Sequence, residues 1–450
     1  MKKLYTLFFA TLFTCGFAGA QTVKVITSEE VARMYGGEQI FAISNNGRYA
    51  VGSTMTMFPF IYDSQEDRTV VFTDELGSSS KVSGGELHFV SDDGVAVGYD
   101  DNGGIRCTAS GEYSIVEKAE GEINMALCVS MTTDGSVIVG SIADGGWVET
   151  PCYWENGARV ALPYPTTEEA GFRINGARAL SISGDGKVIM GQIVDRFQTL
   201  PLIIWERQDD GTYALNKAWE NKFEPLDTPI YDDKGQQIDA IRGDNPYLVF
   251  RPGAMSSDGK TVALYIEENN EDFNPPLLMA LYDVQTGELE LVPEMATGMM
   301  SDYGEFIIRG IADNRTVFGT AGALALGTQP FIVFPDERIP LPLDVAYPEV
   351  DQFQIYFDNK EEGMPYLGTA ISANARFLAG YTIKVTENDM IAEGFIFDSG
   401  VQDDAVEKVE APASGQVEYF TIDGIRLGAP QKGLNIIRDA NGKVSKKLIR

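Results

Sequence analysis

Short apolar runs separated by polar turns dominate this chain, and no helical period of comparable strength competes with them. The clearest stretch runs from Ile182 to Gly191, where an Asp-Gly pair separates two apolar segments. Asp-Gly and Asn-Gly pairs in this setting favour tight hairpins, because both turn residues tolerate positive φ. The pattern therefore predicts two antiparallel strands joined at Asp185-Gly186.

This ten-residue pattern recurs along the chain, which predicts a repeat protein. The fifth copy lacks the final glycine and the sixth is one residue shorter. The other six copies begin at Ile43, Val90, Met131, Met255, Ile311 and Ile371. Internal repeats of this kind indicate an array or a propeller.

A second hairpin follows in most copies and completes a four-stranded unit. Its first strand often begins with proline and ends in an aromatic residue beside an acid, as in Pro151–Glu155 and Pro201–Glu206. Seven four-stranded antiparallel meanders predict an all-β, seven-bladed β-propeller over residues 21–400. The recurring aromatic residues are expected to pack between blades: Tyr62, Trp154, Trp205, Tyr282 and Phe397.

The two ends of this region complement each other. The last repeat supplies only three strands, whereas residues 22–27 (TVKVIT) form a strand that belongs to no repeat. We expect this first strand to pair as the outer strand of the last blade and to close the ring.

The first 20 residues have the features of a secretory signal peptide. Lys2 and Lys3 precede an apolar stretch, and Ala18-Gly19-Ala20 forms a small-residue cleavage site. A lipid-modified Cys15 is the alternative. No later stretch is long and apolar enough for a transmembrane helix, so the sequence predicts a secreted or cell-surface protein.

Composition narrows the range of partners. The formal net charge is -31, and such acidity repels phosphate backbones and anionic membranes, so nucleic-acid binding is not expected. Three cysteines follow the signal peptide, Cys107, Cys128 and Cys152. Their positions in apolar strands favour buried thiols, although a Cys128–Cys152 disulfide remains open.

The repeats resemble extracellular repeat proteins of the HAF type, whose units join an Ile-Ser-x-Asp-Gly-x-x-Val-x-Gly element to an aliphatic-x-Trp-Glu-Asn-Gly element. The best matches are residues 177–191 with 202–206 and residues 131–140 with 153–157. The resemblance covers most of residues 39–400 and implies a propeller fold. It implies no particular activity, since propellers host many functions.

The C-terminal region reads as a linker over residues 401–415 and a small β unit over residues 416–450. Its Tyr419-Phe420-x-Ile422-x-Gly424 element and the later Lys432-Gly433-Leu434-Asn435-Ile436-Ile437 element resemble the C-terminal sorting domain of type IX secretion in Bacteroidetes. This resemblance implies export to the cell surface or the medium.

Long, variable connections on one face of the predicted propeller are the candidate ligand site, because binding residues concentrate on loops of rigid scaffolds. These loops combine aromatic side chains with acids and basic groups, which suits a glycan or a protein partner. An alternative role for each aromatic residue is to hold its loop against the propeller. The candidate residues are Trp147, Asp144, Asp195, Arg196, Phe197, Glu267, Asp272, Phe273, Trp219, Tyr231 and Arg242.

Catalytic signatures are sparse. The single histidine, His88, is expected to pack between blades, and one histidine makes histidine-rich metal sites and a Ser-His-Asp triad implausible. No cofactor motif occurs. Calcium is conceivable among Asp92, Asp93, Asp100 and Asp101, without EF-hand spacing.

The sequence therefore favours a monomeric, non-catalytic binding module. The alternative is a carbohydrate-active hydrolase or lyase that uses loop carboxylates, since paired acids cannot be located from sequence alone.

Overall fold

The computed structural model describes residues 21–401 and four strands within residues 402–450, apart from the following ranges. These are 27, 74–83, 119–124, 144–147, 171–173, 195–198, 217–227, 232–236, 242–247, 269–277, 293–305, 322–328, 336–339, 351–352, 354–366, 386–389, 402–417, 421–425, 428–432, 439–443 and 450, together with 1–20.

Four-stranded antiparallel sheets make up the first of two compact units, Met1–Val401. The first three repeats give β2 (Glu38–Ile43), β3 (Tyr49–Thr54), β4 (Pro59–Asp63), β5 (Arg68–Val71), β6 (Gly85–Val90), β7 (Val95–Asp100), β8 (Gly103–Thr108), β9 (Tyr113–Lys118), β10 (Met125–Met131), β11 (Val137–Ala143), β12 (Glu149–Glu155) and β13 (Ala158–Ala161). The next three give β14 (Gly176–Ile182), β15 (Val188–Val194), β16 (Thr199–Arg207), β17 (Tyr213–Leu215), β20 (Leu248–Met255), β21 (Thr261–Glu268), β22 (Leu278–Asp283), β23 (Leu289–Val292), β24 (Phe306–Ile311), β25 (Val317–Ala321), β26 (Gln329–Val333) and β27 (Pro340–Pro342). The last gives β28 (Leu367–Ile371), β29 (Phe377–Val385) and β30 (Met390–Asp398).

The predicted meander is confirmed, because each repeat pairs its strands in chain order. The third and fourth sheets are also joined by one parallel pair, Glu149 with Gly176. A separate hairpin, β18 (Thr228–Tyr231) with β19 (Gln237–Ile241), lies within the long connection between the fourth and fifth repeats.

The first strand of the chain completes the last sheet, as predicted. β1 (Thr22–Val25) pairs antiparallel with β30, with Val23 opposite Phe397. The short helix α1 (Glu29–Tyr35) that follows was not predicted. Ser28 caps its start by accepting the N–H of Val31, and Gly36 ends it with φ 75°, so one strong cap at each end defines a helix too short for a periodic signal.

The described parts of the chain contain two more short helices, α2 (Thr167–Ala170) and α4 (Leu343–Ala346). None of the described helices is long and apolar enough to cross a membrane.

Hydrophobic clusters lie between neighbouring repeats and confirm the predicted role of the recurring aromatic residues. Trp205 of the fourth repeat is fully buried in a cluster with Val137, Val139 and Tyr153 of the third. Phe397 of the last repeat is likewise buried against residues of the sixth. The aromatic residue at this position therefore stabilises the packing of one sheet on the next.

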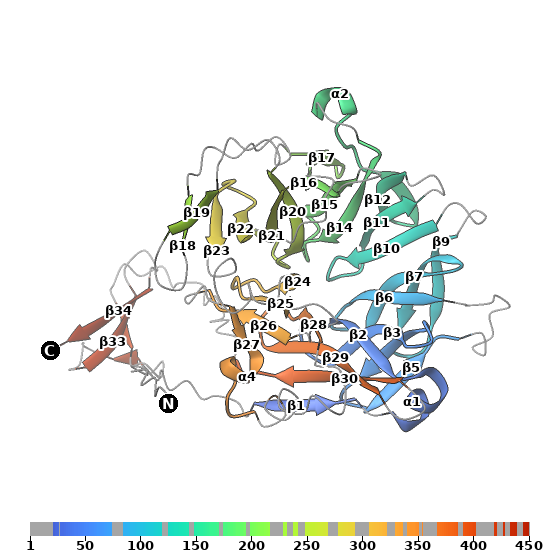
Figure 1. Cartoon of the computed structure of the whole chain (residues 1–450), viewed down its shortest axis with the longest axis horizontal. Coiled ribbons are helices and arrows are strands. Elements are labelled where there is room, and N and C mark those ends of the chain that lie inside the picture. The colour runs from blue at the N-terminus through green and yellow to red at the C-terminus, as the bar shows by residue number, and fades with distance from the viewer. Residues whose placement is uncertain are drawn as a thin grey trace. The chain divides into compact units, whose positions relative to one another are not determined.

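The first strands of the repeats lie nearest a common centre, as Figure 1 shows for β2, β6, β10, β14, β20, β24 and β28. We call these seven strands the inner strands. Successive inner strands contact one another, and β28 of the last repeat contacts β2 of the first.

Hydrogen bonds also join the turns that follow the inner strands. The N–H of Gly184 donates to Ser257 O (2.7 Å), and the N–H of Asp313 donates to Ala373 O (2.8 Å). Between the last and first repeats, the N–H of Asn374 donates to Asn45 Oδ1 at 3.0 Å. These turns thus carry an architectural role.

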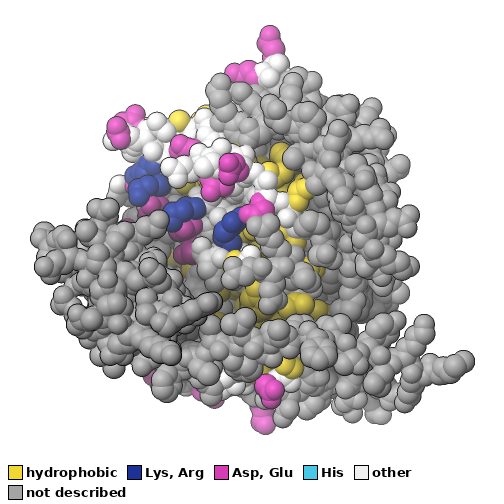
Figure 2. Space-filling view, turned by 90° about the vertical axis from the view of Figure 1, so that its left-hand side faces the viewer, with side chains coloured by type: hydrophobic (Ala, Val, Ile, Leu, Met, Phe, Trp, Pro, Cys, Tyr) yellow, Lys and Arg dark blue, Asp and Glu magenta, His cyan; other side chains and the backbone are white. Residues whose placement is uncertain are grey.

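Some charged side chains of the described surface lie next to groups of opposite charge. Figure 2 shows one side of the molecule, on which lysine and arginine side chains lie beside aspartate and glutamate side chains.

The second compact unit, Gln402–Arg450, contains a small sheet of β31 (Glu418–Phe420), β32 (Arg426–Leu427), β33 (Gly433–Arg438) and β34 (Val444–Ile449).

All three described cysteines are free and buried. Cys128 and Cys152 pair with the same residue, Gly140, from opposite sides of β11. Two strand spacings of about 4.8 Å each separate their backbones, which is more than the ~7 Å that a disulfide spans. Burial raises the pKa of all three thiols, that of Cys152 to about 11.

Candidate binding site at the inner strands

Every inner strand has an irregularity in its pairing at the same place in the repeat. In the second repeat, Leu87 pairs with Gly98 and Phe89 with Val97, which leaves His88 as an extra residue. Such a β-bulge re-aims a side chain, and bulges are frequent next to functional sites. The seven bulge residues are Phe41, His88, Val129, Leu180, Gly253, Arg309 and Thr369.

The bulge explains why the repeat ends in glycine. A Cβ on Gly98 would lie 1.8 Å from Glu86 O, and one on Gly140 would lie 1.8 Å from Leu127 O. In both cases the carbonyl belongs to the residue two positions before the bulge. The same short approach, 2.2 Å or less, occurs at Gly52, Gly191, Gly319 and Gly380. The fifth repeat has Leu264 at this position, and its own bulge residue is Gly253.

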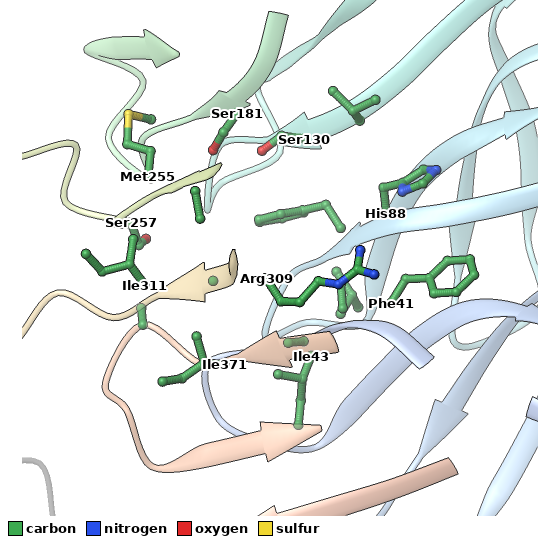
Figure 3. Close-up of a pocket in the computed structure, with 18 of the residues that line it drawn as sticks. Phe41, Ile43, His88, Ser130, Ser181, Met255, Ser257, Arg309, Ile311 and Ile371 are labelled. Atoms are coloured by element: carbon green, nitrogen blue, oxygen red, sulfur yellow. The ribbon is translucent and has the colours of Figure 1, made fainter. Parts of the chain in front are cut away.

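The inner strands surround a cavity of about 710 Å³, which we call the central cavity. Its volume lies in the range of small-molecule sites. Figure 3 shows Phe41, His88 and Arg309 on one side of it, and the apolar Met255 and Ile371 on the other. The side chains at equivalent positions of the repeats differ widely, so the cavity is chemically asymmetric.

Aromatic rings form one wall of this cavity. His88 stacks between Tyr99 (ring centroids 5.3 Å apart, planes at 20°) and Phe41 (6.0 Å, 21°). Phe41 in turn meets Tyr381 edge-on at 6.5 Å. Phe41, His88 and Tyr381 line the cavity from three different repeats, and all four rings are half-buried. The row therefore presents both apolar ring faces and hydroxyl groups.

A carboxylate and an imidazole form a pair beside this row. His88 Nε2 lies 3.1 Å from Glu86 Oε2, and the Tyr99 hydroxyl donates to the same oxygen at 3.3 Å. The contact with His88 lowers the pKa of Glu86, while burial opposes this shift. Burial, together with the charge of Glu86, raises the pKa of Tyr99 to about 12, so this hydroxyl stays protonated at neutral pH.

Arg309 is the one arginine among the described residues that line the cavity. Its side chain is exposed. Burial raises the pKa of the nearby Tyr381, and the positive charge of Arg309 opposes that rise. Within the described part of the chain, Arg309 forms no ion pair.

Most of the ligand-binding residues predicted from sequence are not described by the structure. Nine of them lie outside the described residues: Asp144, Trp147, Asp195, Arg196, Phe197, Trp219, Arg242, Asp272 and Phe273. The backbone places Tyr231 at the end of β18 and Glu267 in β21. The long-loop site therefore stays a prediction.

His88 packs between two repeats, as predicted, but it also borders the central cavity, which the prediction missed. Two of the proposed calcium ligands have other roles. Asp92 accepts the N–H of Asn46 (2.7 Å), and Asp100 accepts the Tyr113 hydroxyl (2.6 Å). Among the described residues, no three His, Cys, Asp or Glu side chains cluster as metal ligands would.

A positional signal for the cavity is present in the sequence. Each bulge residue stands three positions before the serine, threonine or alanine that opens the turn motif, as His88 does before Ser91. Tyr99 and Tyr381 each directly follow the closing glycine of their repeat. Aligning the repeats at these two positions separates the variable cavity residues from the uniform architectural ones.

Comparison with known proteins gives distant structural likenesses only. No family model and no curated protein matches the chain. An oligogalacturonate lyase from Vibrio parahaemolyticus is 8% identical with a TM-score of 0.48, covering 84% of this chain and 97% of the lyase. TolB from Acinetobacter baumannii is 12% identical with a TM-score of 0.36, covering 68% of this chain and 63% of TolB. The WD40 repeats of RRP9 are 8% identical with a TM-score of 0.43, covering 84% of this chain and 97% of RRP9. The chain is thus similar to propeller-like proteins, and its own sheets carry the argument about fold.

Proposed function

We propose that this chain is a secreted, non-catalytic binding protein that holds a glycan in the central cavity of a seven-bladed β-propeller. The single observation that carries this proposal is the bulge in every inner strand, which turns seven unlike side chains toward one cavity. A bulge shared by all repeats, with a side chain that varies, is what a scaffold with one adaptable site requires.

Three contacts support a closed ring of seven blades. β1 pairs with β30, so the two ends of the first compact unit share a sheet. β28 contacts β2, and Asn374 donates to Asn45 across the same junction. Joining the first and last blades through one shared sheet protects a propeller from opening.

The chemistry of the cavity favours a saccharide. Sugar rings offer apolar faces and hydroxyl edges, which match the ring faces of Phe41 and Tyr381 and the polar atoms of Glu86 and His88. The Glu86 carboxylate already binds His88 and Tyr99 through Oε2. Among the described residues, no hydrogen bond to Oε1 is formed, so this oxygen can accept a sugar hydroxyl.

The long connections would extend the site beyond the cavity. Trp147, Phe197 and Trp219 lie in connections that leave the same end of the sheets as the start of each inner strand. We propose that they contact residues of a longer glycan or of a protein that carries it. Loss of binding to long but not short saccharides in Trp147→Ala would support this part.

A glycan array with the mature chain tests the proposal, followed by calorimetry on the best ligand. We expect Phe41→Ala to weaken binding at least tenfold, because it removes the centre of the aromatic row. Phe58→Ala is the matched control, since Phe58 is a half-buried aromatic residue that contacts Tyr35 of α1 instead. Equal loss in both variants, or binding of proteins but of no glycan, would contradict the proposal.

Export is proposed from the two ends of the sequence. Residues 1–20 would direct secretion, and the unit at residues 416–450 would act as a sorting domain of the type IX kind. A chain that ends at residue 410 should then remain inside the producing cell. Normal secretion of that truncated chain would contradict the sorting role.

One observation favours a carbohydrate-active enzyme as the second candidate. A carboxylate close to an imidazole, such as Glu86 with its Oε2 3.1 Å from His88 Nε2, can act in general acid–base catalysis. Incubation with plant and host polysaccharides, followed by measurement of new chain ends, separates the two functions. Turnover that is lost in His88→Gln would establish the enzyme and overturn the binding protein.

A further inference from the structure

We infer that the central cavity selects an acidic saccharide, and that Arg309 recognises its carboxylate. This inference rests on the proposed function, because it names the class of ligand for the same site. Three observations carry it: Arg309 has no ion-pair partner among the described residues, its neighbours on the inner strands leave space beside it, and the other charged groups of the cavity have partners.

Among the described residues, Arg309 has no carboxylate partner, as is also true of Arg33, Arg68 and Arg106, but it alone of these four lines the central cavity. Other arginines are paired. Arg48 binds Asp63 (2.7 Å), and Arg376 binds Asp398 (2.8 Å). Four further arginines pair with carboxylates in the same way: Arg159, Arg178, Arg207 and Arg315. In a chain with formal net charge -31, acids are abundant, yet in the described structure none reaches Arg309. An anion from outside the chain would complete this group.

The position of Arg309 allows a ligand to reach it. It is a bulge residue of β24, so its side chain is turned to the central cavity. On the preceding inner strand the equivalent residue is Gly253, which has no side chain to occupy that flank. On the following inner strand it is Thr369, whose hydroxyl donates to Ala379 O at 3.3 Å. Neither neighbour therefore competes for the guanidinium.

The other charges of the cavity already have partners. Glu86 is held by His88 and Tyr99, and Asp92 accepts the backbone N–H of Asn46. A carboxylate-bearing sugar can therefore bind Arg309 through a bidentate contact, while Phe41 and Tyr381 cover its ring. The net negative charge of the chain opposes anion binding in general, so an acidic ligand is favoured only through its direct contact with Arg309.

Calorimetry with matched saccharides tests this inference. The probes are tetrasaccharides of glucuronic, galacturonic and mannuronic acid, each measured against the neutral parent sugar with the same linkage. We expect at least one acidic probe to bind about 10- to 100-fold more tightly than its parent, the range of a hydrogen bond to a charged group. This preference should shrink as salt is added.

Variants identify the group responsible. Arg309→Gln should abolish the preference and leave the neutral parent unaffected, and Arg309→Lys should restore part of it, since lysine keeps the charge without the bidentate fork. Arg33→Gln, an exposed arginine of α1 outside the cavity, is the control and should behave as wild type. Thermal melts would show that each variant folds.

The inference is overturned if neutral parents bind as tightly as the acids, if the preference survives Arg309→Gln, or if no acidic probe binds. Its failure is distinguishable from failure of the proposed function. If the ligand is a neutral glycan whose binding is weakened by Phe41→Ala, the inference of an acidic ligand is rejected and the glycan site is retained. If no glycan binds in a way that depends on Phe41, both are rejected.

Discussion

Substitution of a repeat-closing glycine is the most direct perturbation of the bulge. In Gly140→Ala, the new Cβ would lie 1.8 Å from Leu127 O of the neighbouring strand. A methyl group and a carbonyl oxygen cannot approach closer than about 3 Å, so β10 and β11 would have to separate by more than an ångström. The oxygen belongs to paired backbone and the Cβ is fixed to its own Cα, so no rotamer change relieves the contact.

The expected cost follows from this geometry. Overpacking of a well-packed interior costs about 1–3 kcal/mol, and a backbone collision belongs at the upper end, about 3 kcal/mol. Gly157→Ala provides the matched control. Its Cβ meets nothing within 4 Å, but its φ of +75° is unfavourable for alanine, which costs about 1–2 kcal/mol. The control has φ strain without a collision, so a larger loss in Gly140→Ala shows that the collision at the bulge costs more than that strain.

Urea unfolding followed by tryptophan fluorescence measures both variants, because Trp154 and Trp205 are buried in the cores on either side of this repeat. We expect Gly140→Ala to lose clearly more unfolding free energy than Gly157→Ala and to weaken ligand binding as well, since β10 contributes Val129 and Ser130 to the cavity. Equal losses in the two variants would refute the explanation of the closing glycine.

Three further predictions concern stability and redox state. Burial raises the pKa of Glu38 from 4.5 to about 7, so the folded chain retains a proton that the unfolded chain releases. The contribution of Glu38 to stability is fully present below about pH 4.5 and should be lost as the pH rises toward 7. Glu38→Gln should therefore raise the free energy of unfolding by about 3 kcal/mol at pH 8 but by little at pH 4. Melting temperatures that fall equally with pH in the wild type and the variant would contradict this. Ala375 occupies the turn position of the motif glycine with φ 61°, so Ala375→Gly should stabilise the chain by up to about 1 kcal/mol, whereas a lower melting temperature would show that its methyl group matters more. The mature chain should contain three thiols that react only after denaturation, and a thiol count of one without reductant would show that a disulfide forms.

Repetition made the sheets predictable, because each Asp-Gly or Asn-Gly turn is specified locally by its own residues. Ser183 and Asp185 fix their turn by accepting the N–H groups of Val188 and Lys187 at 3.0 Å. The pairing of residues 22–25 with the last repeat was predictable for a different reason, since the final repeat lacked one strand. Both inferences needed only the pattern of apolar and polar positions.

The central cavity was not predicted, because a bulge depends on how two strands pair and not on the preference of one residue. Phe41, His88 and Arg309 look unrelated in the sequence and become equivalent only when the register of each inner strand is known. His88 was therefore interpreted as packing alone. The helix α1 was missed because seven residues show too little periodicity.

The single histidine of the chain makes the central claim directly measurable. His88 is the only imidazole, so a mature chain purified without a histidine tag gives one set of imidazole signals in a heteronuclear NMR spectrum. We predict that the saccharide selected on the array shifts these signals in proportion to its occupancy, with the affinity found by calorimetry. A ligand that binds with full affinity and leaves the His88 signals unmoved would place the site elsewhere and contradict the account.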